Sequence, residues 1–186
     1  MAAGDLSTLT NVKQWLGVTT TTDDTLLQRL LTAASGYIQS WLNRTFASAG
    51  YTDTFDGNGK DRLMLRNYPV TAVASVTIDG TVIPASTGVT VNGWLLDETG
   101  KMVILRNYWF NRGTQNIVIS YTAGYATTPP EIEEACIELI GLRYRERDRI
   151  GQVSKAIGGE TVSFTQKDMS DSIKTILNNY KKVVPL

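Results

Sequence analysis

The hydrophobic period of this chain changes twice, and the changes divide the chain into parts. Up to about residue 50, apolar residues recur three and four positions apart, as on one face of a helix. From Tyr51 to Thr122 they alternate with polar residues, and Gly, Asn and Asp turns separate the runs. The helical spacing then returns. We therefore predict an α+β fold: a helical unit, 1–50 with 123–186, that carries an inserted antiparallel β module at 51–122.

The helical unit is expected to contain one short N-terminal helix and three long helices. The short helix spans 8–17, and Asp23 or Asp24 caps a second helix that runs to about Asn43. Apolar residues of the second helix cover an arc of about 160°. Either this helix lies between other helices, or part of it faces another subunit. The candidate interface residues on this helix are Tyr37 and Trp41.

The strongest helix signal spans 129–151. Pro129 and Pro130 suit a first turn, because the missing N–H of proline has no helical partner there. Acidic residues near the start and arginines near the end match the helix dipole, and Gly151 marks a stop. The polar-face acids Glu131, Glu134 and Glu138 are expected to be solvated rather than catalytic. One apolar stripe leads to Arg143 and consists of Ile132, Ala135, Cys136 and Leu139.

The arginine run at the end of this helix consists of Arg143, Arg145, Arg147 and Arg149. Helical spacing allows Arg143 to pair with Glu146, and Arg145 with Asp148, so two acids face four arginines. Arginine makes planar, bidentate contacts with carboxylates and phosphates, and it suits interfaces. Three interpretations stay open: a solvated helix end, an interface with a subunit or partner protein, and a contact with DNA.

The β module is expected to contain six or seven short strands in an antiparallel sheet, a small sandwich or a barrel. The sequence Asp56-Gly57-Asn58-Gly59 predicts a hairpin turn between strands at 51–55 and 62–65. Val89 and Val91 predict a further strand before Asn92-Gly93.

Three consecutive aromatic residues in the β module are Tyr108, Trp109 and Phe110. Successive side chains of a strand point to opposite faces, so at least one of the three lies at a loop, an edge or an interface. Packing at the rim of the sheet explains the cluster. A stacking platform for sugars or bases is the alternative.

The C-terminal part begins with an expected loop at 154–159 and one short strand at 160–164. A last helix follows from about 171 to 182. Beyond it, Pro185 stops any helical continuation of an apolar tail. Either the tail folds back on the core of its own chain, or a partner buries it. The tail residues concerned are Val183, Val184 and Leu186.

Composition argues against several function classes. The chain has 186 residues and a net charge of zero, which argues against a general coating of nucleic acid. It has no histidine, the commonest metal ligand and general base. Its single cysteine, Cys136, fits a small buried hydrophobe. We expect no catalytic residue, cofactor or metal, although a hydrolase that uses only carboxylates stays an alternative.

Neither a signal peptide nor a membrane span is expected. Residues 1–10 contain no apolar run, and no stretch approaches the ~20 apolar residues that a spanning helix needs.

Three groups of residues occur in a specific order over nearly the whole chain. They are a helix at 9–16 followed by Asp23-Asp24-Thr25-Leu26-Leu27, then Tyr121-Thr122-Ala123-Gly124-Tyr125 before Pro129-Pro130, then Tyr144-Arg145-Glu146-Arg147-Asp148-Arg149 followed by Gly158-Gly159-Glu160. In this order and spacing the chain resembles the head–tail connector (adaptor) proteins of tailed phages. The β module is larger than in the purely helical connectors.

The resemblance implies a non-enzymatic ring below the portal that extends the DNA channel and carries the next neck or tail-completion protein. The implied partners are the portal protein, the downstream neck protein and further copies of this chain, with DNA only as passing cargo and no membrane. The implied location is the virion neck, after assembly in the host bacterial cytoplasm. In this reading the arginine run is interfacial, and the C-terminal tail docks on the portal or a neighbour. The alternative function is a tail-associated carbohydrate- or receptor-binding module that uses the β insert.

Overall fold

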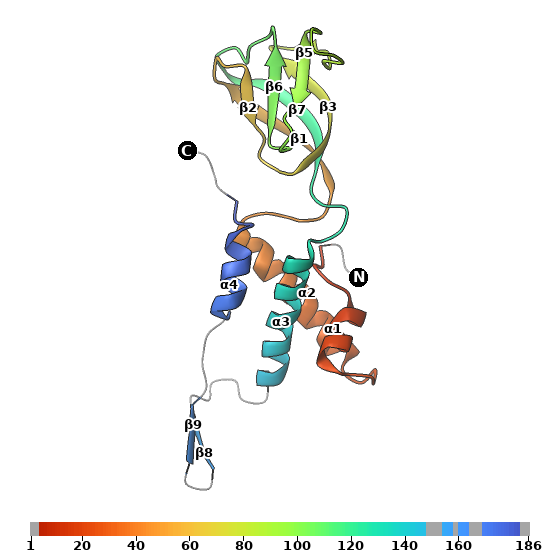
Figure 1. The fold of residues 1–186 in the computed structure, drawn as a ribbon, viewed down its shortest axis with the longest axis vertical. Coiled ribbons are helices and arrows are strands. Elements are labelled where there is room, and N and C mark those ends of the chain that lie inside the picture. The colour runs from red at the N-terminus through yellow and green to blue at the C-terminus, as the bar shows by residue number, and fades with distance from the viewer. Residues whose placement is uncertain (1–3, 148–153, 158–159, 164–168, 183–186) are drawn as a thin grey trace. The chain divides into compact units, whose positions relative to one another are not determined.

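The computed structural model describes residues 4–147, 154–157, 160–163 and 169–182 (Figure 1). The described residues form four helices and nine strands, which confirms the predicted α+β fold. The chain divides into two compact units: a helical unit, Met1–Phe46 with Thr128–Leu186, and a β unit, Ala47–Thr127.

The helical unit contains the four helices and one two-stranded sheet. They are α1 (Leu9–Leu16), α2 (Asp24–Leu42), α3 (Pro130–Glu146), α4 (Asp171–Asn178), β8 (Ser154–Ile157) and β9 (Glu160–Ser163). The Thr8 hydroxyl oxygen accepts a hydrogen bond from the Asn11 N–H at 3.1 Å and so caps α1, while Gly17 ends this helix at a φ of 70°. The Ser170 hydroxyl oxygen caps α4 in the same way, accepting from the Ile173 N–H at 3.2 Å.

Two helices are shorter than predicted. α3 ends at Glu146, and the side chain of the next residue, Arg147, donates to the Tyr144 carbonyl oxygen at 2.6 Å. The predicted stop, Gly151, lies outside the described residues. α4 has eight residues, so it is as short as α1 and not one of three long helices. Residues 154–157, expected as a loop, form β8, which pairs antiparallel with β9.

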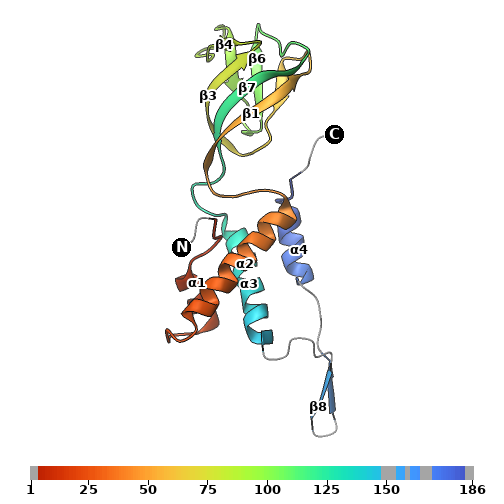
Figure 2. The same ribbon diagram turned by 180° about the vertical axis from the view of Figure 1, so that it is seen from behind.

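α3 is the central helix of this unit and contacts α1, α2 and α4. It lies between α1 and α4 in Figure 1, and Figure 2 shows α2 crossing it on the opposite side. All four residues of its predicted apolar stripe are fully buried. The residues that α2 buries are Leu27, Leu31, Ala34, Ser35, Ile38 and Leu42.

The β unit contains seven strands in two sheets. Its strands are β1 (Ala49–Gly57), β2 (Arg62–Met64), β3 (Val70–Ile78), β4 (Thr81–Ile83), β5 (Gly93–Leu96), β6 (Met102–Arg106) and β7 (Gly113–Ala123). The sheet orders are β1-β7-β3-β4 and β2-β6-β5, and every named strand pair is antiparallel. Both sheets contribute to one buried core that includes Phe55, Val76, Val103, Phe110 and Ile119.

The predicted hairpin around residues 56–59 is wrong. β1 pairs with β7 and β2 pairs with β6, so the two strands that flank this turn lie in different sheets. The turn instead pairs with the loop before β7: the Gly59 N–H donates to the Phe110 carbonyl at 2.7 Å, and the Phe110 N–H donates to the Lys60 carbonyl at 2.9 Å.

The predicted strand at Val89 and Val91 is also wrong. The Ser86 hydroxyl donates to the carbonyl oxygens of Gly88 and Val91, at 3.2 and 2.7 Å, and holds these residues in a loop. The strand begins later, at Gly93.

Candidate functional site

The arginine end of α3 packs on aromatic rings of its own unit. The Cζ atoms lie 5.1 Å from the Tyr37 ring centroid for Arg143 and 5.3 Å from the Trp15 ring for Arg145. Arg147 lies over Tyr144, at 4.0 Å. Each such contact contributes about 0.5–1 kcal/mol at an exposed site. The rings fix the guanidinium groups without neutralising them. Arg149 lies outside the described residues.

Two of these arginines have no acidic partner among the described residues. Neither the Arg143 nor the Arg145 side chain makes an ion pair or a hydrogen bond with any described residue. The predicted pairing of Arg143 with Glu146 is wrong, because the guanidinium turns to the Tyr37 ring instead. Asp148, the predicted partner of Arg145, lies outside the described residues. Their donors are therefore free for a carboxylate that the described part of the chain does not supply.

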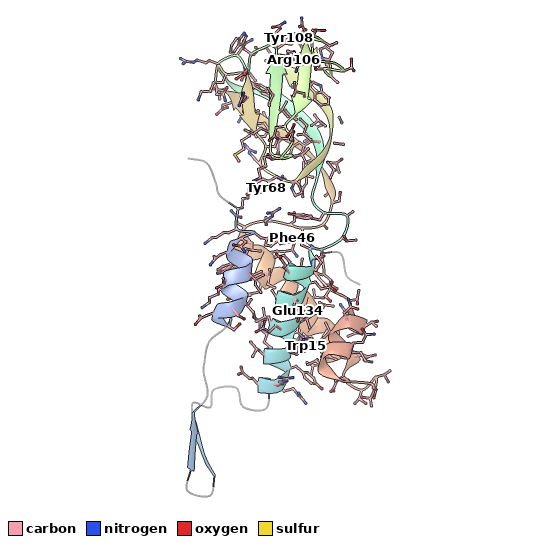
Figure 3. All side chains as sticks on the ribbon, viewed as in Figure 1. Trp15, Phe46, Tyr68, Arg106, Tyr108 and Glu134 are labelled. Atoms are coloured by element: carbon pink, nitrogen blue, oxygen red, sulfur yellow. The ribbon has the colours of Figure 1, made fainter. Side chains whose placement is uncertain are left out.

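Trp15 and Tyr144 join this end of α3 to the other helices. A Cβ atom at Gly141 would lie 2.3 Å from Cζ3 of Trp15, so the indole rests directly on the glycine backbone. Figure 3 labels Trp15 beside α3. The Tyr144 hydroxyl donates to the Asp23 carboxylate at the start of α2. Our sequence prediction missed Trp15, since only the tertiary packing brings α1 against residue 141.

Of the three acids expected on the solvated face of α3, Glu131 and Glu134 are exposed and Glu138 is half-buried, and two of them also accept hydrogen bonds from residues that flank α4. The Glu131 carboxylate accepts from the Tyr180 hydroxyl at 2.7 Å, and Glu138 accepts from the Ser170 hydroxyl at 3.2 Å. Glu133 accepts from the Ser7 hydroxyl at 2.8 Å and from the Asn11 side-chain amide at 2.7 Å. These bonds tie α3 to α4 and to the N-terminal segment. Glu134 is exposed and makes no hydrogen bond or ion pair within the described residues.

The two interface candidates on α2 are half-buried by their own chain. Tyr37 lies under Arg143, and the Lys181 ammonium lies 5.2 Å from the Trp41 ring centroid. Leu26, on the same side of α2, is 37% exposed. The wide apolar arc of α2 is thus covered in part by other helices and in part open. The tail candidates Val183, Val184 and Leu186 lie outside the described residues.

The aromatic cluster of the β unit does not form a three-residue platform. Phe110 is fully buried in the core, Tyr108 packs against that core, and Trp109 is 61% exposed. A stacking surface for a sugar or base could therefore use Trp109 but not Phe110.

Reactive chemistry has little support in the described part of the chain. Cys136 is fully buried, and burial raises the pKa of its thiol to about 11, so it is a packing residue. Within the described ranges, no three His, Cys, Asp or Glu side chains are grouped so that they could hold a metal ion. None of the described helices has the length and apolar character to cross a membrane.

Comparison with known proteins identifies the family. Residues 5–183 match the head completion protein family. The chain belongs to this family. The match confirms the resemblance to head–tail connectors and makes the chain a virion structural protein of the phage type. A search of curated proteins finds no match.

Solved structures of gene transfer agent (GTA) particles contain the same fold as this head completion protein. Chains from the neck of an empty GTA particle computed with C6 symmetry, the neck of a native GTA particle computed with C12 symmetry and the virion of native GTA have TM-scores of 0.60, 0.59 and 0.60. Their identities are 18, 16 and 17%, and each match covers 100% of this chain and 94% of the other chain. At this identity the likeness establishes the fold.

Proposed function

We propose that this chain is a non-enzymatic head–tail connector of a tailed phage or prophage, assembled in the host cytoplasm and located in the virion neck. Copies of the chain form a ring below the portal, extend the DNA channel and carry the next neck or tail protein. The observation that supports this proposal most is the family match over residues 5–183, together with the fold shared with chains of GTA neck particles.

The rotational symmetry of the neighbouring structures supports the ring. The GTA necks were computed with C6 and C12 symmetry, and a chain with the same fold in an equivalent place would repeat around the same axis. Such a ring closes through heterologous contacts, in which one surface of each copy meets a different surface of the next. A net charge of zero suits a channel through which DNA must slide, since a strongly basic channel would bind it.

The arginine run supports a docking role toward an acidic partner. Arg143 and Arg145 are held in place by aromatic rings, while no carboxylate of the described chain neutralises them. We assign Arg143, Arg145, Arg147 and Arg149 to a contact with acidic residues of the portal or of a neighbouring copy. The apolar tail residues Val183, Val184 and Leu186 are assigned to the same docking role.

A gene deletion in the source phage or prophage tests the function. We expect heads that contain DNA but have no tails, and we expect the wild-type gene supplied in trans to restore tailed particles. If the chain is instead a receptor-binding tail module, the deletion yields complete tailed particles that fail to adsorb to the host. Complete, adsorbing particles would contradict both functions.

Substitution of the arginines tests the docking role. Arg143→Ala combined with Arg145→Ala should reduce the number of tailed particles, while the free energy of unfolding of the purified protein falls by no more than about 1–2 kcal/mol, the sum of the two cation–π contacts that are lost. Arg62→Ala, at an exposed arginine of the β unit, is the control. Normal particle numbers from a folded double variant would contradict the role.

A further inference from the structure

The outward face of α2 is almost uncharged for a helix surface in contact with solvent. Its exposed residues are Thr25, Leu26, Arg29, Thr32, Ala33, Gly36 and Ser40. Arg29 is the only charged residue among them, and it makes no ion pair or hydrogen bond within the described part of the chain. Surface helices of monomers normally carry charged residues on the face opposite the core. This face therefore has the composition of a surface that another protein covers.

A broad, shallow groove of about 780 Å³ lies along the same face. Its lining comprises Leu9 at the start of α1 and Asp24, Thr25, Gln28, Arg29, Thr32 and Ala33 of α2. The Asp24 carboxylate is paired with the Lys13 ammonium at 2.6 Å, so within the described residues Arg29 is the charge of this lining that has no partner. The groove has room for side chains from an approaching element, and Arg29 places a positive charge at its wall. An acidic residue on the occupant would complement this charge.

The outward face of α3 supplies such an acid. Glu134 is exposed, and within the described residues it accepts no hydrogen bond and makes no ion pair. The three other acids of this helix segment are bonded to α4 or to the N-terminal segment. Figure 3 labels Glu134 on α3, in the view in which α2 lies behind that helix.

The two faces point in opposite directions. At 100° per residue, Glu134 lies about 160° around α3 from Cys136, which contacts Ser35 of α2 at 3.7 Å. Arg29 lies about 120° around α2 from Ser35, on the side away from α3. Figures 1 and 2 show the same relation, since α3 is in front in one view and α2 in the opposite view. One copy therefore cannot join Arg29 to its own Glu134, whereas adjacent copies can.

We propose that the α2 face of one copy, around Arg29 and its groove, binds the α3 face of the next copy, around Glu134. The contact is heterologous, because it joins different surfaces of the two copies, and repeating it around an axis closes a ring. This inference rests on the proposed connector function and specifies the surfaces through which its ring forms.

Charge reversal tests the contact. Arg29→Glu and Glu134→Arg should each reduce the number of tailed particles by about tenfold or more, because each places like charges at every subunit contact. The chain that carries both substitutions should recover to within about threefold of wild type. Glu98→Arg, at an exposed acid of the β unit that makes no bond within the described residues, should have no effect. Circular dichroism and thermal unfolding of each purified variant verify folding.

The outcomes separate this inference from the function itself. The contact is supported if both folded single variants form fewer tailed particles and the double variant recovers. Normal assembly of the single variants, or no recovery in a folded double variant, overturns it while the connector function stands. If another protein occupies one of the two faces, one single variant forms few tailed particles, and the double variant forms equally few. If the deletion strain makes complete adsorbing particles, the proposed function itself is wrong.

Discussion

At the scale of single residues, Gly141 decides how the arginine end of α3 is built. Trp15 packs on the glycine backbone, and Arg145, one turn further along α3, lies over the same indole. A side chain at position 141 would push the indole away and remove the surface that orients this guanidinium. The position therefore links core packing to the presentation of a charged group.

We predict that Gly141→Ala lowers the free energy of unfolding by about 1–3 kcal/mol, because the added methyl overlaps the Trp15 ring. Gly36→Ala is the matched control: it is also in a helix, but its Cβ would meet nothing within 4 Å. There, alanine should increase stability by roughly 0.5–1 kcal/mol. Urea unfolding of the isolated protein measures both changes. Equal changes in the two variants would contradict the proposed packing.

Tyr121 gives the β unit a pH-dependent contribution to stability. Burial, with its hydrogen bond to the Asp53 carboxylate at 2.5 Å, raises the pKa of Tyr121 to about 12. The folded state therefore holds this proton more tightly than the unfolded state, whose tyrosine pKa is near 10. The contribution is fully present below pH 10 and is lost as the pH rises toward 12. Wild type should lose stability over this range more steeply than Tyr121→Phe; parallel curves would contradict the assignment.

At the scale of elements, the sequence predicts the local structure of single helices better than it predicts which strands pair with each other. Hydrophobic periodicity identifies α1, α2 and the buried stripe of α3, and Thr8 marks the start of α1, because those signals lie within each helix. Asp23, a predicted cap of α2, stands before that helix but makes no capping hydrogen bond, because its carboxylate accepts from the Tyr144 hydroxyl. The predicted turn at residues 56–59 is wrong in part, because β1 continues to Gly57 and residues 58–61 connect it to β2. The two strands pair with different partners, so Phe55 and Leu63 lie in different sheets of one shared core. The stacking of Arg143 and Arg145 on Tyr37 and Trp15 could not be predicted either, since those contacts join distant parts of the sequence.

α4 is a short helix whose stability depends on its cap and on its contacts with α3. An eight-residue helix is marginal in isolation. The Ser170 hydroxyl oxygen accepts from the Ile173 N–H and the hydroxyl donates to Glu138, so one side chain both caps α4 and binds it to α3. We predict that Ser170→Ala costs about 1 kcal/mol.

Hydrogen exchange measures the Ser170 effect locally. Amides of 171–178 should exchange faster in Ser170→Ala, whereas Asn178→Ala, at an exposed position of α4 whose side chain makes no hydrogen bond within the described residues, should change the free energy of unfolding by less than about 0.5 kcal/mol. Unchanged exchange in Ser170→Ala would show that α4 does not depend on this cap.

At the scale of the whole molecule, we propose that the β unit is an inserted domain that folds independently. It has its own core, and the first residue of β1 pairs with the last residue of β7, Ala49 with Ala123, so its two ends are adjacent. A fragment of residues 47–127 should unfold cooperatively in urea and give dispersed amide resonances. A fragment without a cooperative transition would show that the β unit needs the helical unit.

The central claim is that copies of this chain form a ring in the virion neck. Cryo-electron microscopy of neck complexes that contain the portal and this chain tests it most directly. We predict a closed ring coaxial with the DNA channel, in which Arg29 of each copy faces Glu134 of the next. A single copy on each portal, or copies located away from the channel axis, would contradict the account.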